Sequence, residues 1–225
     1  MLVSICYLYV QNGFSSLLLF VALRMADGEA FVTTKSKYLQ QLCYLKSTNL
    51  GEEFDNCMTY RVLLYSLREQ LLIFVEKQFE EFIKHYQLCK KSSAEIIKFL
   101  VRFVRTTVPS DKDFERKAKQ RIVKINQLQE KQFTAISWQS VAGCFTERFV
   151  RGLNVTFDPK DLLEIFIFCN FFPLDICSAA FKVRSHRNEF DGHLFVLLID
   201  AKTLQSLKGA IDTLLFQIEN YGTKC

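Results

Sequence analysis

The sequence predicts an α+β protein, in which a helical N-terminal region precedes a small C-terminal strand–helix–strand–helix module. Three observations support this prediction. Apolar residues recur every three or four positions through much of the first two thirds of the chain, as they do in amphipathic helices. Two almost unbroken apolar runs, at 162–169 and 193–199, have the composition of buried strands. The last segment, 202–221, returns to the helical period.

The composition is that of a chain that folds. It has 225 residues, 49% of them hydrophobic and 22 of them Phe, which is enough for one large domain or two small ones. Only three Pro and eight Gly are present, which excludes a collagen-like or linker-like chain, and the Phe content argues against disorder. A net charge of +5 permits contact with nucleic acid or a membrane but predicts neither.

We expect three segments: an apolar segment at 1–24, a helical domain at 25–156 and the α+β module at 157–225. Residues 2–23 carry no charge and have about the length of a transmembrane helix. Three interpretations stay open for them: a membrane anchor, a buried strand or helix, or an extension upstream of a start at Met25. The expected location is the cytoplasm and nucleus, with membrane anchoring through residues 2–23 as the alternative.

Four helices are expected before residue 156. The first covers 54–86, with charges opposite its apolar stripe. The second begins at Ser92, which forms a capping-box pattern with Glu95, and Pro109 stops it. The third, at about 111–129, is polar and basic, and the fourth covers about 131–151.

The expected module begins after Asp158-Pro159, which we interpret as a turn because the residue before a proline is pushed out of the helical region. A strand at 162–169 and a short apolar helix follow. Asp191-Gly192 predicts a hairpin turn before the second strand, and the final helix places its apolar side chains on one stripe.

The residue types give little sign of chemistry. None of the eight cysteines forms a C-x-x-C pair, and most lie in apolar runs, which favours reduced, buried thiols. His85, His186 and His193 belong to no nucleophile or metal motif, and no phosphate-binding loop occurs. The dense basic segment from Arg102 to Lys124 could contact phosphates, but a solvated helix face is favoured. We therefore predict a protein that is not an enzyme and has no cofactor and no metal site.

The C-terminal third resembles a known family. The matching positions follow a Gly-led strand that ends in Ala and then the helix after it: Gly192, Ala201, Leu207, Lys208, Ala210, Ile211, Asp212, Thr213 and Leu215. This pattern is similar to the CTAG/Pcc family, the small dimer-forming subunits of the KEOPS (EKC) complex, with Lys208 and Asp212 in place of the usual Arg and Asn. Upstream, the segment around 163–181 resembles the first strand, Phe-Pro turn and first helix of that family.

The resemblance implies a non-catalytic assembly or dimerisation subunit that supports threonylcarbamoyladenosine modification of tRNA. Its partners would be protein subunits of a complex or a second copy of the chain, with at most indirect or weak contact with tRNA. The expected partner-binding residues are Ala201, Leu207, Lys208, Ile211, Leu214 and Ile218, although the same apolar stripe could pack on the chain's own core. A COMM-type trafficking adaptor, which the final strand and helix also resemble, and a membrane-anchored helical protein are the alternatives.

Overall fold

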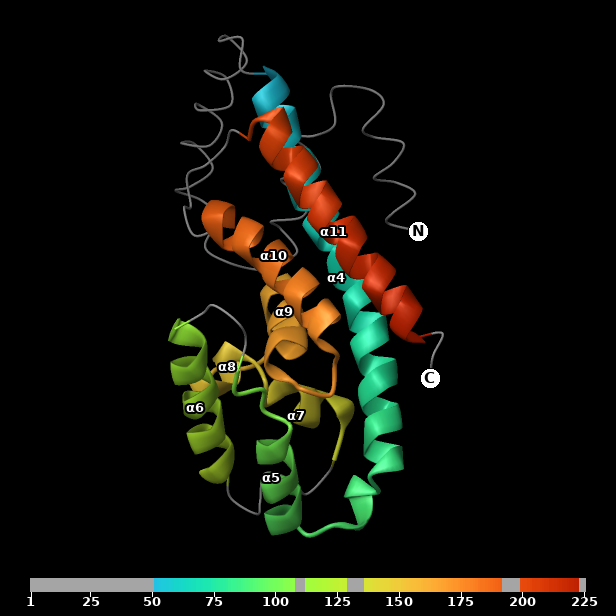
Figure 1. Cartoon of the computed structure of the whole chain (residues 1–225), viewed down its shortest axis with the longest axis vertical. Coiled ribbons are helices and arrows are strands. Elements are labelled where there is room, and N and C mark those ends of the chain that lie inside the picture. Colours follow the sequence, from blue (N-terminus) through green and yellow to red (C-terminus); the bar gives the residue numbers. More distant parts are fainter. Residues whose placement is uncertain (1–50, 108–111, 129–135, 192–198, 223–225) are drawn as a thin grey trace, which may run out of the picture. The chain divides into compact units, whose positions relative to one another are not determined.

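The computed structural model describes residues 51–107, 112–128, 136–191 and 199–222 (Figure 1). They fall into two compact units. The first contains 51–62 and 199–204, and the second contains the described residues between 63 and 191 together with 205–222. The described residues are helical and contain no strand, only a single isolated bridge, so the predicted α+β class is wrong for this part of the chain.

The first two predicted helices are confirmed. Helix α4 runs from Gly51 to His85, and a short 3-10 helix, η1, covers Leu88–Lys90. Helix α5 covers Ser93–Arg102. It begins with the expected capping box, because the Ser92 hydroxyl accepts from the Glu95 amide at 3.4 Å and the Glu95 carboxylate accepts from the Ser92 amide at 2.8 Å.

Helix α5 ends at Arg102, well before Pro109, which lies outside the described residues. The chain leaves the helix to form the isolated antiparallel bridge between Val104 and Cys169. The Arg105 amide donates to the Phe168 carbonyl at 2.8 Å, and the Asn170 amide donates to the Phe103 carbonyl at 2.9 Å. These long-range backbone bonds replace the last helical turns that the apolar pattern predicts.

The third predicted helix is confirmed as α6, Lys112–Asn126, but the fourth is wrong as a single helix. Two short helices, α7 at Trp138–Gly143 and α8 at Glu147–Val150, stand in its place, and residues 131–135 lie outside the described part. Thr146 separates them. Its buried hydroxyl donates to the Gly143 carbonyl at 2.9 Å and accepts from the Phe149 amide at 3.3 Å, so one side chain ends α7 and begins α8.

The predicted strand at 162–169 is the helix α9, Pro159–Phe168. Asp158 is the N-cap, whose carboxylate accepts from the Asp161 amide at 2.9 Å, and Pro159 opens the first turn. Every residue from Asp161 to Phe168 is completely buried. A helix buried on all sides has the same continuous apolar run as a buried strand, which is why the composition was misleading.

Helix α10 covers Leu174–Asp191, so the predicted short helix continues through the polar segment up to the expected hairpin turn at Asp191-Gly192. Residues 192–198, including most of the predicted second strand, lie outside the described residues, and Ile199 belongs to no strand. The final helix is confirmed as α11, Ala201–Gly222. Asp200 precedes it, and its carboxylate accepts from the Thr203 amide at 2.7 Å.

Aromatic side chains form a core in the second unit. Phe172 packs against Phe166 at 4.7 Å between ring centroids, and Phe82 contacts Phe103 and Phe171 at 5.0 Å each. Phe74 on α4 meets Tyr221 on α11 edge-on at 6.3 Å. These side chains come from α4, the segment after α5, α9, the turn before α10, and α11, so the core joins elements far apart in sequence.

Burial of the cysteines is confirmed for most of those that the structure describes. Cys57, Cys144, Cys169 and Cys177 are buried and Cys89 is exposed, and no disulfide joins any two of these five. Burial raises the pKa of the Cys144 and Cys169 thiols to about 12, so neither is a reactive thiolate at neutral pH.

In the described part of the chain, none of the helices combines the length and the apolar character needed to cross a membrane. Residues 2–23 lie outside the described residues.

Candidate functional site

The structure places the predicted partner-binding residues along α11. Ala201 is exposed and belongs to the first unit. In the second unit, Lys208 is half-buried, and the four apolar residues are buried within the chain itself: Leu207, Ile211, Leu214 and Ile218. Their burial gives them a place in the chain's own core, and their binding of a partner stays a prediction.

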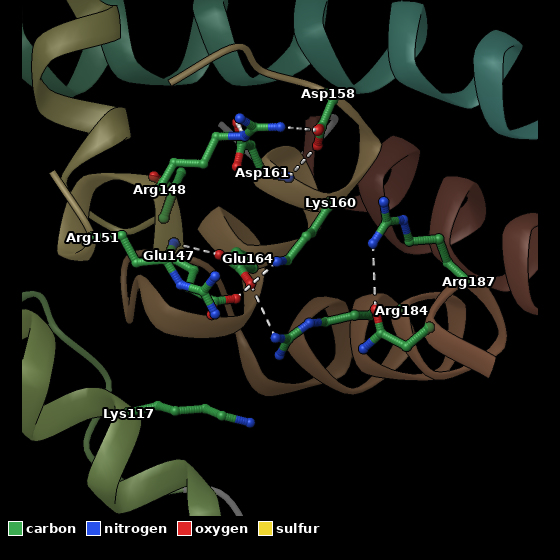
Figure 2. Close-up of polar contacts among 12 residues, drawn as sticks. Lys117, Glu147, Arg148, Arg151, Asp158, Lys160, Asp161, Glu164, Arg184 and Arg187 are labelled. Carbon is green, nitrogen blue, oxygen red and sulfur yellow. Dashed lines mark hydrogen bonds and ion pairs between the residues drawn. The ribbon is translucent and has the colours of Figure 1, made fainter. Parts of the chain in front are cut away.

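A different set of residues forms the most developed polar site, a cluster of charged side chains centred on α9 (Figure 2). Glu164 lies at its centre, in the middle of the buried helix, and its side chain is inaccessible to solvent. One carboxylate oxygen accepts from Arg184 of α10 at 3.0 Å. The other accepts from Arg121 of α6 at 3.3 Å and from the Glu147 amide at the start of α8. One carboxylate therefore links four helices.

Arg121 is held from several directions. Its guanidinium donates to the Phe145 carbonyl at 2.8 Å and to the Lys117 carbonyl at 3.1 Å, and it lies 3.4 Å from the centre of the Phe168 ring. Burial lowers the pKa of Arg121 to about 10, while the charge of Glu164 opposes that change. Arg121 remains a cation at neutral pH, although it is only 2% exposed.

Asp161, one turn before Glu164, fixes the loop that precedes α9. Its carboxylate accepts from the Thr156 amide at 3.1 Å and from the Phe157 amide at 3.2 Å, and it pairs with Arg148 at 3.4 Å. Burial and the nearby Asp158 raise the pKa of Asp161, against the effect of those partners. Phe157 has a left-handed φ of 52°, so this hydrogen-bonded loop holds a strained backbone conformation.

Glu147 forms the outer part of the cluster, where Figure 2 shows it between Arg151 and Lys160. Lys160 pairs with it at 2.8 Å, and Arg151 donates to its other oxygen. Burial opposes ionisation of Glu147, but the hydrogen bond and charge of Lys160, together with Arg151, outweigh burial and lower the pKa to about 2.

Next to the cluster lies a groove of about 920 Å³ between α6 and α8, which we call the α6–α8 groove. Arg121 contributes to its lining, so the buried network and the groove share one side chain. Two of the lining residues are acidic, Glu115 and Glu147. Six are basic: Arg116, Lys117, Lys119, Arg121, Lys124 and Arg151.

Sequence reasoning identified the basic segment but treated it as a solvated face. Most of its α6 side chains are exposed or half-buried, as expected, but Arg121 and Arg105 are buried. The importance of Glu164 was missed. Its signal was present, since Glu164 is the only charge in the apolar run 162–169, and an ionised side chain there needs a partner.

The histidines of the described residues do not join this cluster. His85 is exposed on α4, and His186 on α10 lies 3.2 Å from the Ser206 hydroxyl. His193 lies outside the described residues. Among the residues described, no group of His, Cys, Asp and Glu side chains is arranged to hold a metal ion.

Comparison of the chain with protein-family models, curated proteins and solved structures found no match. The geometry of the cluster and of the α6–α8 groove is therefore the basis for the functional argument.

Proposed function

We propose that this protein is a non-catalytic assembly subunit, which binds other proteins through a helical body and performs no reaction itself. The observation behind this proposal is how the acids of the cluster are used. Glu164, Asp161 and Glu147 each bind a basic side chain and at least one further donor, and together they fasten α6, α8, α9 and α10 to one another. They act as joints between helices: both oxygens of Glu164 and of Glu147 have partners, and one oxygen of Asp161 does, while its Oδ1 is buried without a hydrogen-bond partner.

The surface supports the same proposal. Ile73 on α4 and Phe216 on α11 are 68% and 60% exposed, and Tyr65, two turns before Ile73 on α4, is 50% exposed. Aromatic side chains such as Tyr and Phe are enriched where proteins bind one another. Exposed Tyr65 and Phe216 therefore suit a subunit that binds neighbouring proteins.

A more specific form of this proposal follows from the resemblance to the CTAG/Pcc family. In that form, the chain supports threonylcarbamoyladenosine modification of tRNA through contacts with KEOPS-type subunits in the cytoplasm and nucleus. Helix α11 agrees with the final helix that the resemblance predicts. The first strand of the resemblance is replaced by α9, so the support for this form comes only from the segment after residue 190.

Affinity purification of the C-terminally tagged chain from its own cells, followed by mass spectrometry, tests the general proposal. We expect a stable set of co-purifying proteins in near-equal amounts. Recovery of the chain alone, under conditions that preserve known complexes in the same extract, would contradict it.

The specific form has its own test. If the chain serves a KEOPS-type complex, the set will include a threonylcarbamoyl-transferase and its kinase, and deletion of the gene will lower threonylcarbamoyladenosine in tRNA. Unchanged levels of that nucleoside would eliminate the specific form. Recovery of endosomal or ubiquitin-ligase components would instead support a COMM-type adaptor.

A further inference from the structure

We propose that the α6–α8 groove binds an acidic, amphipathic peptide segment of a partner protein. This inference rests on the proposed function, because it names the chemistry of one partner of an assembly subunit. Its basis is the charge of the side chains that line the groove and their order along α6.

The first step is the local charge balance. Two arginines, Arg121 and Arg184, share the single carboxylate of Glu164, and two further cations, Arg151 and Lys160, share Glu147. Each of these two groups therefore retains one excess positive charge. Both groups lie beside the groove, since Arg121, Glu147 and Arg151 are among its lining residues.

The second step concerns the α6 wall. Asp113 forms ion pairs with Arg116 at 3.3 Å and Lys117 at 3.9 Å. Within the described residues, no ion pair joins Lys119 or Lys124 to a carboxylate. The groove thus presents cations that are available to an anionic ligand, and a ligand with several carboxylates would balance the excess.

The third step is the arrangement of these groups along the helix. Lys117, Gln120 and Lys124 recur at three- and four-residue intervals and all line the groove, so they form one row on α6, which Gln127 continues just after the end of the helix. Lys117 and Lys124 are seven residues apart, about 10 Å along the helix axis. Figure 2 shows the Lys117 side chain extending from α6 below the cluster. A linear row of separated donors matches carboxylates repeated along a peptide better than one compact phosphate.

The fourth step distinguishes a peptide from a nucleic acid. The apolar lining consists of Val123 on α6, which is 55% exposed, and Val150 on α8, which is half-buried. None of the described residues that line the groove is aromatic, whereas single-stranded nucleic acids are bound by stacking bases on aromatic rings. Two valines among cations fit a segment that alternates carboxylates with aliphatic side chains.

The test uses the full chain and a fluorescein-labelled 16-residue peptide of Glu and Leu, with the two residues on opposite faces of a helix. Fluorescence anisotropy should show binding that weakens as salt is raised, because the contacts are ionic. In the double variant Lys117→Glu and Lys124→Glu we expect at least a tenfold weaker Kd. The matched control is Lys77→Glu and Lys84→Glu on α4, two exposed lysines with the same seven-residue spacing and the same change of net charge. The Kd of this control variant for the peptide should stay within twofold of the wild-type Kd.

Two further measurements test the proposed peptide chemistry. Val123→Ser should raise the Kd for the peptide several-fold and leave the Kd for poly(U) RNA unchanged. The proposal is overturned if poly(U) binds more tightly than the peptide, or if the two double variants lose the same affinity. Circular dichroism of every variant should give the same helical signal as the wild type, which excludes unfolding as the cause of weaker binding.

A cellular experiment separates this inference from the proposed function. The tagged double variant of the groove should lose one member or more of the co-purifying set and keep the others. If it recovers the complete set, the groove is not the binding site, although the chain is still an assembly subunit. If the wild-type chain recovers no stable set, the proposed function fails whatever the peptide result.

Discussion

The two buried arginine sites on α9 use different means to hold a cation away from water. At the C-terminal end of the helix, Arg105 donates to the carbonyl oxygens of Ile167, Cys169 and Phe172, and no carboxylate from the described parts of the chain pairs with it. In the middle of α9, Arg121 and Arg184 are bound by the carboxylate of Glu164.

The position along the helix explains the difference. The last carbonyls of a helix have no partner within it and form the negative end of its dipole, so a guanidinium can be satisfied there without an anion. The middle of a helix has no free carbonyls. At that level α9 can offer a buried cation only a side chain, and Glu164 supplies it with an ionised carboxylate.

The largest effect is expected from Glu164→Gln. The substitution keeps the size of the side chain but leaves two buried guanidinium groups without their anion. Removing one partner of a buried ion pair costs about 3–5 kcal/mol. We expect a loss of that order in the free energy of unfolding, measured by urea denaturation monitored by circular dichroism.

The matched control for this variant is Glu115→Gln, an exposed carboxylate that lines the neighbouring groove. It should change stability by less than about 0.5 kcal/mol. Adding Arg184→Met to Glu164→Gln should recover part of the loss, because one unpaired cation is removed. A Glu164→Gln variant as stable as the control would show that the cluster is not a structural joint.

The next effect is expected from Arg105→Leu. It removes the donors to three carbonyls around the end of α9, and buried carbonyls without partners cost about 1–3 kcal/mol. Arg105→Lys should recover little of this loss, because an ammonium group cannot reproduce the planar fork of a guanidinium. Thermal denaturation should show a clear fall in Tm for both variants, and no change for the exposed control Arg102→Leu.

The starts of α5 and α9 show how far the sequence could predict the structure. The capping box at Ser92 and Glu95 is a local signal, made by residues three positions apart, and it was predicted correctly. In α9, Asp158-Pro159 was assigned to a turn, although an acidic residue followed by Pro is equally a helix N-cap and first turn. The apolar run could not decide between helix and strand, because burial on all sides removes the periodicity that separates them.

The candidate site was less predictable than the helices. The basic residues of α6 that line the groove were recognisable in the sequence as a local cluster of charge. The pairing of Arg121 with Glu164 joins residues 43 positions apart, and that of Arg184 with Glu164 joins residues 20 apart. Such contacts depend on how helices pack, and one sequence contains no direct record of them. The charge of Glu164 within an apolar run of the sequence predicts that a partner exists, but not which one.

The smallest effect is expected at the outer edge of the cluster, where Glu147 pairs with Lys160 and Arg151 in partial contact with solvent. Its pKa is lowered from an ordinary value of 4.5 to about 2 by folding. A carboxyl group whose pKa is depressed in the folded state stabilises the protein above its unfolded pKa, and this stabilisation is lost as the pH falls through the folded value. Wild type should therefore exceed Glu147→Gln in stability near neutral pH and converge with it between about pH 4.5 and 2.

The expected difference near neutral pH is only about 1 kcal/mol, because solvent screens the pair. Urea denaturation of both proteins from pH 7 to pH 2 measures it, and Lys160→Met in the Glu147→Gln background should add little if the pair acts as a unit. Asp161 contributes with the opposite sign, since burial and Asp158 raise its pKa, so protonation of Asp161 as the pH falls favours the folded state. A difference between wild type and Glu147→Gln that stays constant down to pH 2 would mean that Glu147 owes its role to packing and not to its charge.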